Sequence, residues 1–411
     1  MPPDDQAEPV DPPSRHRVPA RDVGAAVAAS TSSSLGVFLV GASAIEIRAS
    51  LHFGATAFGL ALSLYYLGAA AGSVPFGRLA EGVGGLRVMR WAAVAAAGSL
   101  LAIAILARSW VTLTVLLVVA GVVSSSMQPA SNLFLSRRIP DTRQGLAFGI
   151  KQAAVPAAAL LGGLAVPAIA LTIGWRWAFV FAAVLATGTI AILPRTRSRL
   201  AAYRAGRTAR TAPPVGLPLV VLTTGFFLGI FAANGLTGFL VTSAVASGIT
   251  DGHAGLLAAA AGTVAVAVRV VVGYRADHRG RAHFPVVALM LVIGVAGYGA
   301  LAAGSATGWH WLFMVGAVVA FGAGWGWNGL FNFAVVRTHR DAPARATSIT
   351  QVGGRLAGVA GPITFGLVAT HASYTAAWSM DGSAAMVGAA VILVGRHHLV
   401  RALAGIPPVD G

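Results

Sequence analysis

Three basic side chains lie inside long apolar segments of this sequence: Lys151, Arg269 and Arg355. A cation at the depth of a lipid bilayer costs about 2.5–3.5 kcal/mol on insertion scales, so it normally faces a cavity or a partner. Arg presents a planar fork of donors that matches a carboxylate, whereas Lys is a compact ammonium on a flexible stem. Lys151 is also the single lysine of the chain. We predict that these residues bind a small anion, most simply a carboxylate.

Each cation also has a purely structural interpretation. Arg269 lies one turn before Gly273, so it could extend to the membrane surface or pair with Asp277. Lys151 lies about 9 Å into its expected helix, within reach of the surface for a long side chain. Arg355 lies about 14 Å or more from either end of its expected helix. Arg355 is therefore the most difficult of the three to explain without a ligand.

Amide and aromatic side chains accompany the cations in two of the apolar segments. They recur at helical spacing, so each set shares one helix face: Gln128 with Asn132, and Trp325 with Asn328 and Asn332. Such side chains either line a cavity or only tie helices together within the bilayer. We predict that both sets line a substrate cavity, with the amides and Trp325 providing its shape.

The composition requires a membrane protein. The 411 residues are 56% hydrophobic and 10% charged, whereas about a quarter of the residues of a soluble domain are charged. The chain has no cysteine, which excludes disulfides and thiolate metal sites. Twelve apolar segments are long enough to span a bilayer: Val23–Ile45, Ala55–Phe76, Val88–Leu106, Val111–Leu135, Gly145–Ile173, Trp177–Leu193, Leu217–Val245, Ala254–Val272, Phe284–Ala303, Trp309–Val336, Ala346–Thr370 and Tyr374–Val394.

The two halves of the chain repeat each other. Gln128 and Asn132 recur 200 residues later as Asn328 and Asn332, and Gln152 recurs 199 residues later as Gln351. The predicted fold is therefore an all-α membrane protein with two pseudo-symmetric bundles of six helices. The expected divisions are a disordered tail at 1–20, a bundle at 21–194, a basic linker at 195–216, a second bundle at 217–398 and a tail at 399–411.

Basic residues predict the orientation of the chain. They concentrate in the polar segments on the same side as the N-terminus, and the segments on the other side contain only Arg48, Arg108 and Arg176. Because cytoplasmic loops are rich in Lys and Arg, both termini should be cytoplasmic. The basic residues lie in short turns between apolar runs, so the net charge of +16 does not indicate a nucleic-acid partner.

Two short polar turns, half a chain apart, carry a common pattern of glycine, carboxylate and glycine. The first contains Gly77, Arg78, Glu81 and Gly84, and the second contains Gly273, Asp277, Arg279 and Gly280. These turns resemble the paired signature of the major facilitator superfamily of transporters. Glu81 stands where that signature has Asp, and Arg275 stands where it has Leu. The resemblance implies that the carboxylates close an inner gate, with Arg137 or Arg138 pairing with Glu81 and Arg337 with Asp277.

The resemblance also bears on the cations. Carboxylate transporters of this superfamily have a substrate-binding Arg in the eighth helix, four residues before the second-motif glycine, and Arg269 has this spacing to Gly273. Related oxalate carriers have a second cation in the eleventh helix, where Arg355 lies. The fourth and tenth helices, which hold Gln128, Asn132 and the set around Trp325, border the substrate path in this superfamily.

These observations predict a secondary transporter that moves a small anionic solute, most simply a carboxylate, through the cytoplasmic membrane by alternating access. The alternatives are a proton-coupled exporter of drugs or metabolites and a membrane sensor that transports nothing. No nucleophile–base pair, nucleotide-binding loop or metal-ligand spacing is present, so we expect neither an enzyme nor a cofactor. The expected partners are a small-molecule substrate, a coupling proton and the lipid bilayer, with the protein acting as a monomer. The exact solute, the direction of transport and the coupling ion stay open.

Overall fold

The computed structural model describes residues 20–195, 216–278 and 283–404. Twelve helices within these ranges are long and apolar enough to cross a membrane, as the sequence predicts. The first six spans are built from α1 (Ala20–Ala42), α3 (Ala55–Val83), α4 (Gly85–Leu106), α5 and α6 (Trp110–Ser124, Met127–Arg138), α7, α8 and η2 (Gln144–Lys151, Ala154–Ala165, Val166–Ala170), and α9 (Trp175–Ile192). Two short elements, α2 (Ala44–Leu51) and η1 (Asp141–Arg143), lie between spans.

The last six spans repeat this plan. They are built from α11 (Leu217–Ala246), α12 (Asp251–His278), α13 (His283–Thr307), α14, η3 and α15 (His310–Val319, Ala320–Trp325, Asn328–Thr338), α16 (Pro343–His371) and α17 (Tyr374–Ala404). The predicted tail 1–20 and linker 195–216 fall almost entirely outside the described residues. The last helix, α17, continues past the predicted tail boundary at residue 399.

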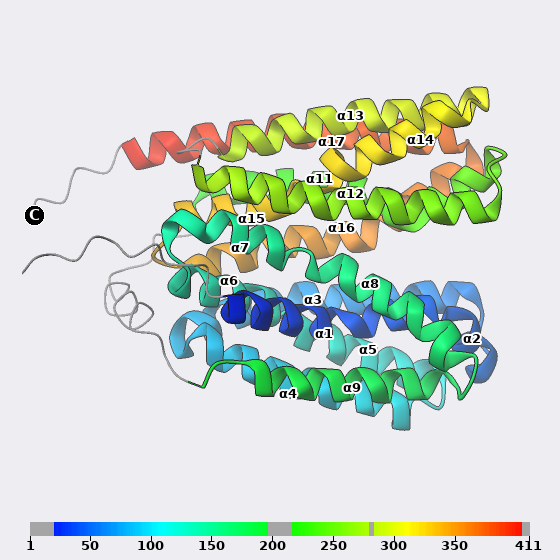
Figure 1. The fold of residues 1–411 in the computed structure, drawn as a ribbon, viewed down its shortest axis with the longest axis horizontal. Helices are drawn as coiled ribbons and strands as arrows, with labels where there is room; N and C mark the ends of the chain where they lie inside the picture. Colours follow the sequence, from blue (N-terminus) through cyan, green and yellow to red (C-terminus); the bar gives the residue numbers. More distant parts are fainter. Residues whose placement is uncertain (1–19, 196–215, 279–282, 405–411) are drawn as a thin grey trace, which may run out of the picture.

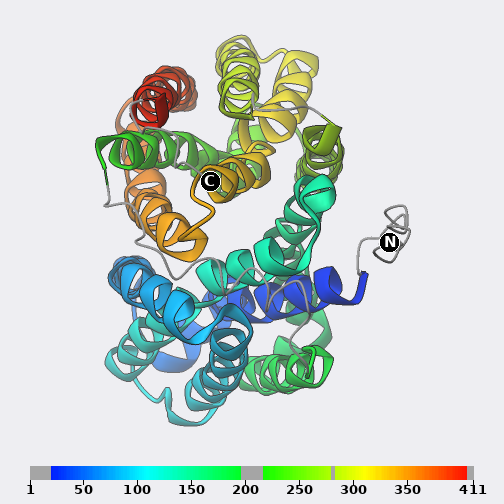
Figure 2. The ribbon, with the colours of Figure 1, turned by 90° about the vertical axis from the view of Figure 1, so that its left-hand side faces the viewer.

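The two sets of spans form two bundles, called here the first half (α1–α9) and the second half (α11–α17). Figure 1 shows the first half below the second, with α6, α7 and α15 between them at one end. That end holds the start of α1, the end of α9, the start of α11 and the end of α17, and we call it the linker end. Figure 2 views the molecule from this side. The opposite end, where α2 lies, is called the distal end.

Small residues fill the helix interfaces and large apolar residues cover the outside. The buried positions are rich in alanine, whereas Leu106, Leu160, Leu256 and Trp311 are each more than half exposed. Lipid tails are as apolar as leucine, so burial of leucine between helices gives little energy, and close packing of small residues favours association instead.

Three spans are interrupted near their middles, although their sequences predict continuous helices. α5 gives way to α6 at Ser125 and Ser126, α7 gives way to α8 after Lys151, and a π-helical turn separates α14 from α15. At the first interruption Ser124, Ser125 and Ser126 each donate a hydroxyl to the carbonyl three residues earlier. Such side-chain bonds compete with the helical ladder and bend it. The interruptions place Gln128, Lys151 and Asn328 at helix ends in the middle of the protein.

Candidate anion-binding site

Lys151 lies at the end of α7 and is fully buried. Its ammonium donates to the side-chain oxygen of Asn132 at 2.9 Å and also to the side-chain oxygen of Gln128. Both acceptors belong to α6, so the predicted helix face is a real one. Lys151 forms no ion pair with any described residue. The chain thus holds a cation in its interior with amide dipoles as its protein partners.

The second half contains a neutral counterpart of this cluster. Gln351 of α16 donates to the Asn332 side-chain oxygen at 3.3 Å, and the Asn332 amide donates to the Asn328 side-chain oxygen at 2.8 Å. Lys151 follows Asn132, and Gln351 follows Asn332, by the same 19 residues. Lys151 is therefore the equivalent of Gln351. The correspondence of Gln152 with Gln351 that the sequence suggested was wrong by one residue.

A hydrogen bond between the halves joins the two clusters. The Gln152 amide donates to the Asn328 side-chain oxygen at 3.1 Å. Together these groups form what we call the polar layer: Gln128, Asn132, Lys151, Gln152, Asn328, Asn332 and Gln351. The layer crosses from one half to the other at the level of the helix interruptions.

Arg355 lies on α16, one turn nearer the distal end than Gln351. It is half-buried, and it makes no hydrogen bond or ion pair with the described residues; its Nε is buried without a partner. Across from it, Tyr66 of α3 packs against α16, since a Cβ built on Gly358 would lie 3.1 Å from the Tyr66 ring. Arg355 is thus a half-buried cation between the halves that no described residue pairs with.

Arg269 has a different environment. Its guanidinium donates to the Gln152 carbonyl at 3.0 Å and to the Trp325 carbonyl at 3.2 Å, and it stacks over the Trp325 ring at 4.3 Å from the centroid. The side chain is 3% exposed, so it neither reaches the surface nor pairs with Asp277. It ties α12 of the second half to α7 of the first, and only its Nε has no partner.

The first motif closes the linker end against the second half. Glu81 accepts hydrogen bonds from the backbone N–H groups of Ala344 at 2.6 Å and Arg345 at 3.4 Å, in the first turn of α16. A carboxylate at a helix N-terminus is stabilised by the helix dipole. The predicted pair with Arg137 is present at 3.4 Å. Arg138 instead binds Asp22 of α1 at 3.0 Å.

The second motif makes the equivalent contact, from a carboxylate of the second half to a helix N-terminus of the first half. Asp277 of α12 accepts from the backbone N–H groups of Gly145 at 2.6 Å and Leu146 at 2.9 Å, in the first turn of α7. The predicted pair of Asp277 with Arg337 was wrong, because helix N–H groups satisfy the carboxylate. Arg337 and Arg340 lie beside Asp141 instead, at 3.7 Å and 3.1 Å.

Glycines of both motifs allow the halves to approach each other closely. A Cβ on Gly77 would overlap the Ser348 side chain, and a Cβ on Gly273 would overlap the Gly145 carbonyl. Gly84 ends α3 with φ of +97°, a conformation that favours glycine. Arg78 is exposed and bonds to no described residue, whereas Arg279 and Gly280 lie outside the described residues.

The hydrogen bonds and ion pairs between the described parts of the two halves are confined to one side. Within the described ranges, every hydrogen bond and ion pair that joins the halves lies in the polar layer or between it and the linker end. The linker end is therefore closed. Arg355 lies on the distal side of this closure.

The comparisons with known proteins agree with this architecture. The profile of the Major Facilitator Superfamily matches residues 26–362. The chain belongs to the major facilitator superfamily. Two solved structures share the fold: the proton:xylose symporter XylE bound to 6-bromo-6-deoxy-D-glucose (14% identity, TM-score 0.77, 91% of this chain and 95% of that chain) and the human organic anion transporter MFSD10, or TETRAN (17%, 0.71, 93% and 100%). No curated protein sequence matches this chain significantly.

Membership of the superfamily makes this a multi-pass membrane protein and indicates a transporter rather than an enzyme. The superfamily fold has two related six-helix halves with the substrate between them. This plan agrees with the position of the polar layer. The likeness to the two solved structures, at 14% and 17% identity, shows the fold alone.

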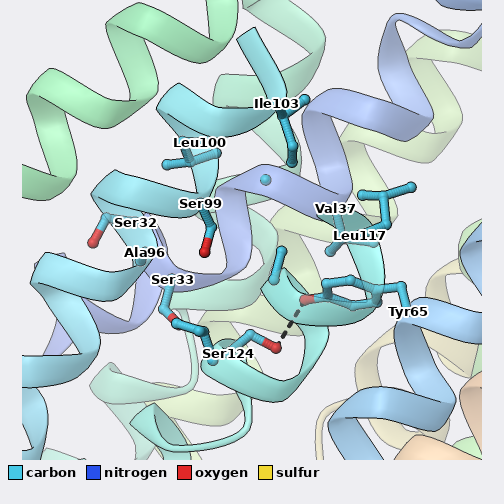
Figure 3. A pocket seen from close by; sticks show the side chains of 13 residues that line it. Ser32, Ser33, Val37, Tyr65, Ala96, Ser99, Leu100, Ile103, Leu117 and Ser124 are labelled. Atoms are coloured by element: carbon cyan, nitrogen blue, oxygen red, sulfur yellow. Dashed lines mark hydrogen bonds between the residues drawn. The ribbon is translucent and has the colours of Figure 1, made fainter. Parts of the chain in front are cut away.

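A small pocket inside the first half is separate from the polar layer. Ser32, Ser33, Ser99, Ser124 and Tyr65 give it polar walls (Figure 3), and the Tyr65 hydroxyl donates to Ser124 at 2.9 Å. Its volume of about 20 Å³ suffices for one water molecule and no more. The pocket is too small for an organic substrate.

The sequence missed three of the residues that surround the site. Gln152 and Gln351 were noticed as a repeat but not as binding candidates, and Tyr66 was not noticed. The constant spacing of 19 residues from Asn132 to Lys151 and from Asn332 to Gln351 is a signal that identifies Gln351. Tyr66 leaves no such signal, because tyrosine is common in membrane helices and its approach to α16 depends on the packing of the halves.

Proposed function

We propose that this protein is a secondary transporter that moves a small organic anion, most simply a carboxylate, by alternating access. The observation that carries the proposal is the pair of cations, Lys151 and Arg355, which lie between or beside the halves and form no ion pair with the described residues. A buried cation normally has a charged partner or a functional role. A substrate carboxylate supplies the missing negative charge during each transport cycle.

In this proposal each residue of the site has its own role. Arg355 receives the carboxylate through its planar fork, and Lys151, held by Gln128 and Asn132, supplies a second positive charge in the polar layer. Asn328, Asn332 and Gln351 bind polar groups of the substrate or the waters around it. Arg269 with Trp325 closes the path toward the linker end and becomes available to substrate when the halves separate there.

We further infer that the linker end faces the cytoplasm of a cell whose cytoplasmic membrane holds this protein, as the distribution of basic residues predicts. The structure is then closed to the inside. The protein acts as a monomer, because each chain contains both halves and the site between them. A coupling proton needs a titrating group, and Asp381 of α17 is a fully buried carboxyl whose two oxygens have no partner among the described residues.

The proposal is tested by binding to the purified protein. Thermal-shift and calorimetric titrations with acetate, oxalate and benzoate should show binding that Arg355→Gln weakens about 10- to 150-fold, the value of about 1.5–3 kcal/mol for a lost charge-assisted contact. Arg355→Lys should also weaken binding, because an ammonium cannot reproduce the bidentate fork. Arg48→Gln, at the distal end, is the matched control. If no anion binds the wild-type protein, or if Arg355→Gln behaves as Arg48→Gln does, the proposed function is wrong.

A further inference from the structure

A hollow in the first half lies beside the proposed anion site and bears on which anion is carried. It has a volume of about 310 Å³ and lies between α1, α3 and α8, within the range of about 300–1,000 Å³ of ligand pockets. Val37, Phe38, Leu62, Tyr66, Ala159 and Gly163 are among its walls. Of the described residues that line it, only Tyr66 has a polar side-chain atom.

Tyr66 connects this hollow with Arg355. Tyr66 lines the hollow, and its ring packs against Gly358 of α16. Arg355 precedes Gly358 by three residues, so both lie on the face of α16 that meets α3. A carboxylate held by Arg355 therefore has the Tyr66 ring beside it and the hollow beyond that ring.

The apolar lining of the hollow determines which chemical groups the rest of the ligand can carry there. A hydroxyl placed against these walls finds one polar side chain, that of Tyr66, and a buried polar group without a partner weakens binding. A methylene placed there leaves water and strengthens binding by about fourfold. We propose that the substrate is a monocarboxylate with an aliphatic or aromatic body, whose carboxylate binds Arg355 and whose body fills the hollow. This inference rests on the proposed anion transport and narrows its substrate class.

The test compares ligands that differ in the body alone. Acetate, butyrate, hexanoate, phenylacetate and gluconate are titrated into the purified full-length protein by calorimetry, with hexanamide as the uncharged analogue of hexanoate. Affinity should rise by about fourfold per methylene from acetate to hexanoate. Gluconate, with its hydroxyls, should bind no better than acetate, and hexanamide should bind far more weakly than hexanoate.

The variant Gly163→Leu fills the hollow. A Cβ at Gly163 meets no atom within 4 Å, so the added side chain enters open space instead of forcing helices apart. Gly163→Leu should remove the gain in affinity from acetate to hexanoate. Gly188→Leu, also without an atom within 4 Å of its Cβ but on an exposed face of α9, is the matched control. If Gly163→Leu does not fold, Gly41→Leu fills the same hollow with equally free space at its Cβ.

The outcomes distinguish a failure of the inferred substrate class from a failure of the proposed anion transport. If carboxylates bind through Arg355 but gluconate and acetate bind as tightly as hexanoate, the hollow has no role and anion transport stands. If hexanamide binds as tightly as hexanoate, the hollow holds apolar molecules, lipid included, without Arg355, and the inferred substrate class is wrong. If no carboxylate binds the wild-type protein, or if Arg355→Gln does not weaken binding, the proposed anion binding is itself wrong.

Discussion

Removal of one charge at the linker end should shift the balance between the closed and open forms of the transporter. Glu81→Gln keeps the shape of the side chain and one acceptor oxygen. It removes the negative charge that now faces the N–H groups of Ala344 and Arg345 and the guanidinium of Arg137. Because these partners belong partly to the second half, the loss falls on the closed form.

The size of the shift follows from the contacts. A hydrogen bond to a charged acceptor contributes about 1.5–3 kcal/mol, against about 0.5–1.5 for a neutral one. The helix dipole adds about 0.3–1 kcal/mol. The Arg137 pair is long at 3.4 Å and its carboxylate is 19% exposed, so it adds at most about 1 kcal/mol. We expect a total of about 1–3 kcal/mol, which changes the ratio of open to closed form by about 5- to 150-fold.

The absence of native cysteine makes this ratio measurable. Ser348 is fully buried against Gly77 at the closed linker end, so a Ser348→Cys reporter reacts with a maleimide only when that end opens. Its labelling rate should rise by about 5- to 150-fold in Glu81→Gln. Glu46→Gln, the same change at the distal end, should leave the rate as it was.

A second reporter tests whether Glu81→Gln loosens the packing of the whole protein. Thr189→Cys lies buried in α9 within the first half and should react at the same slow rate with or without Glu81→Gln. An unchanged rate at position 348 would show that Glu81 does not hold the gate. Equal acceleration at positions 348 and 189 would show a loss of packing instead of gate opening.

Three further predictions follow from the same structure. Lys151→Gln should fold with wild-type thermal stability, as the Gln351 cluster shows that an amide fits this environment, yet bind carboxylates about 10- to 150-fold more weakly; wild-type binding would remove Lys151 from the site. Asp381→Asn should keep anion binding but lose the response of proteoliposome transport to an imposed pH gradient, and a retained response would exclude Asp381 as the proton carrier. In sealed right-side-out vesicles an impermeant maleimide should label Ser50→Cys but not Gly82→Cys; the reverse result would invert the proposed orientation.

Local features of the sequence determined much of the fold. A bilayer admits helices that satisfy their own backbone groups, so twelve apolar runs with polar turns were enough to predict twelve spans. The repeat at about 200 residues predicted the two related halves. Insertion cost likewise identified Lys151, Arg269 and Arg355 as unusual, because the penalty for a cation in lipid does not depend on knowing its neighbours.

The positions of the helix interruptions were not predictable in this way. Hydropathy averages over many residues, and the interruptions after Ser124 and Lys151 depend on hydroxyl-to-carbonyl bonds and on tertiary contacts of single side chains. Those bonds compete closely with the helical ladder, so neighbouring helices decide the result. The interruptions in turn set where the polar layer lies.

The partners of the cations were decided by tertiary structure. The sequence already singled out Arg355 as the most difficult cation to explain without a ligand, but it left Arg269 to reach the membrane surface or to pair with Asp277. Packing of α12 against the end of α7 and against η3 brings the Gln152 and Trp325 carbonyls to Arg269, whereas α16 faces α3 at a tyrosine and Arg355 has no acceptor among the described residues. Likewise, the sequence showed Asp277 and Arg337 as opposite charges, but the N-terminus of α7, which no local pattern places near Asp277, supplies donors already fixed in position. Hydrogen-bond partners from the other half of the chain depend on how two bundles meet, and that geometry is a property of the whole fold.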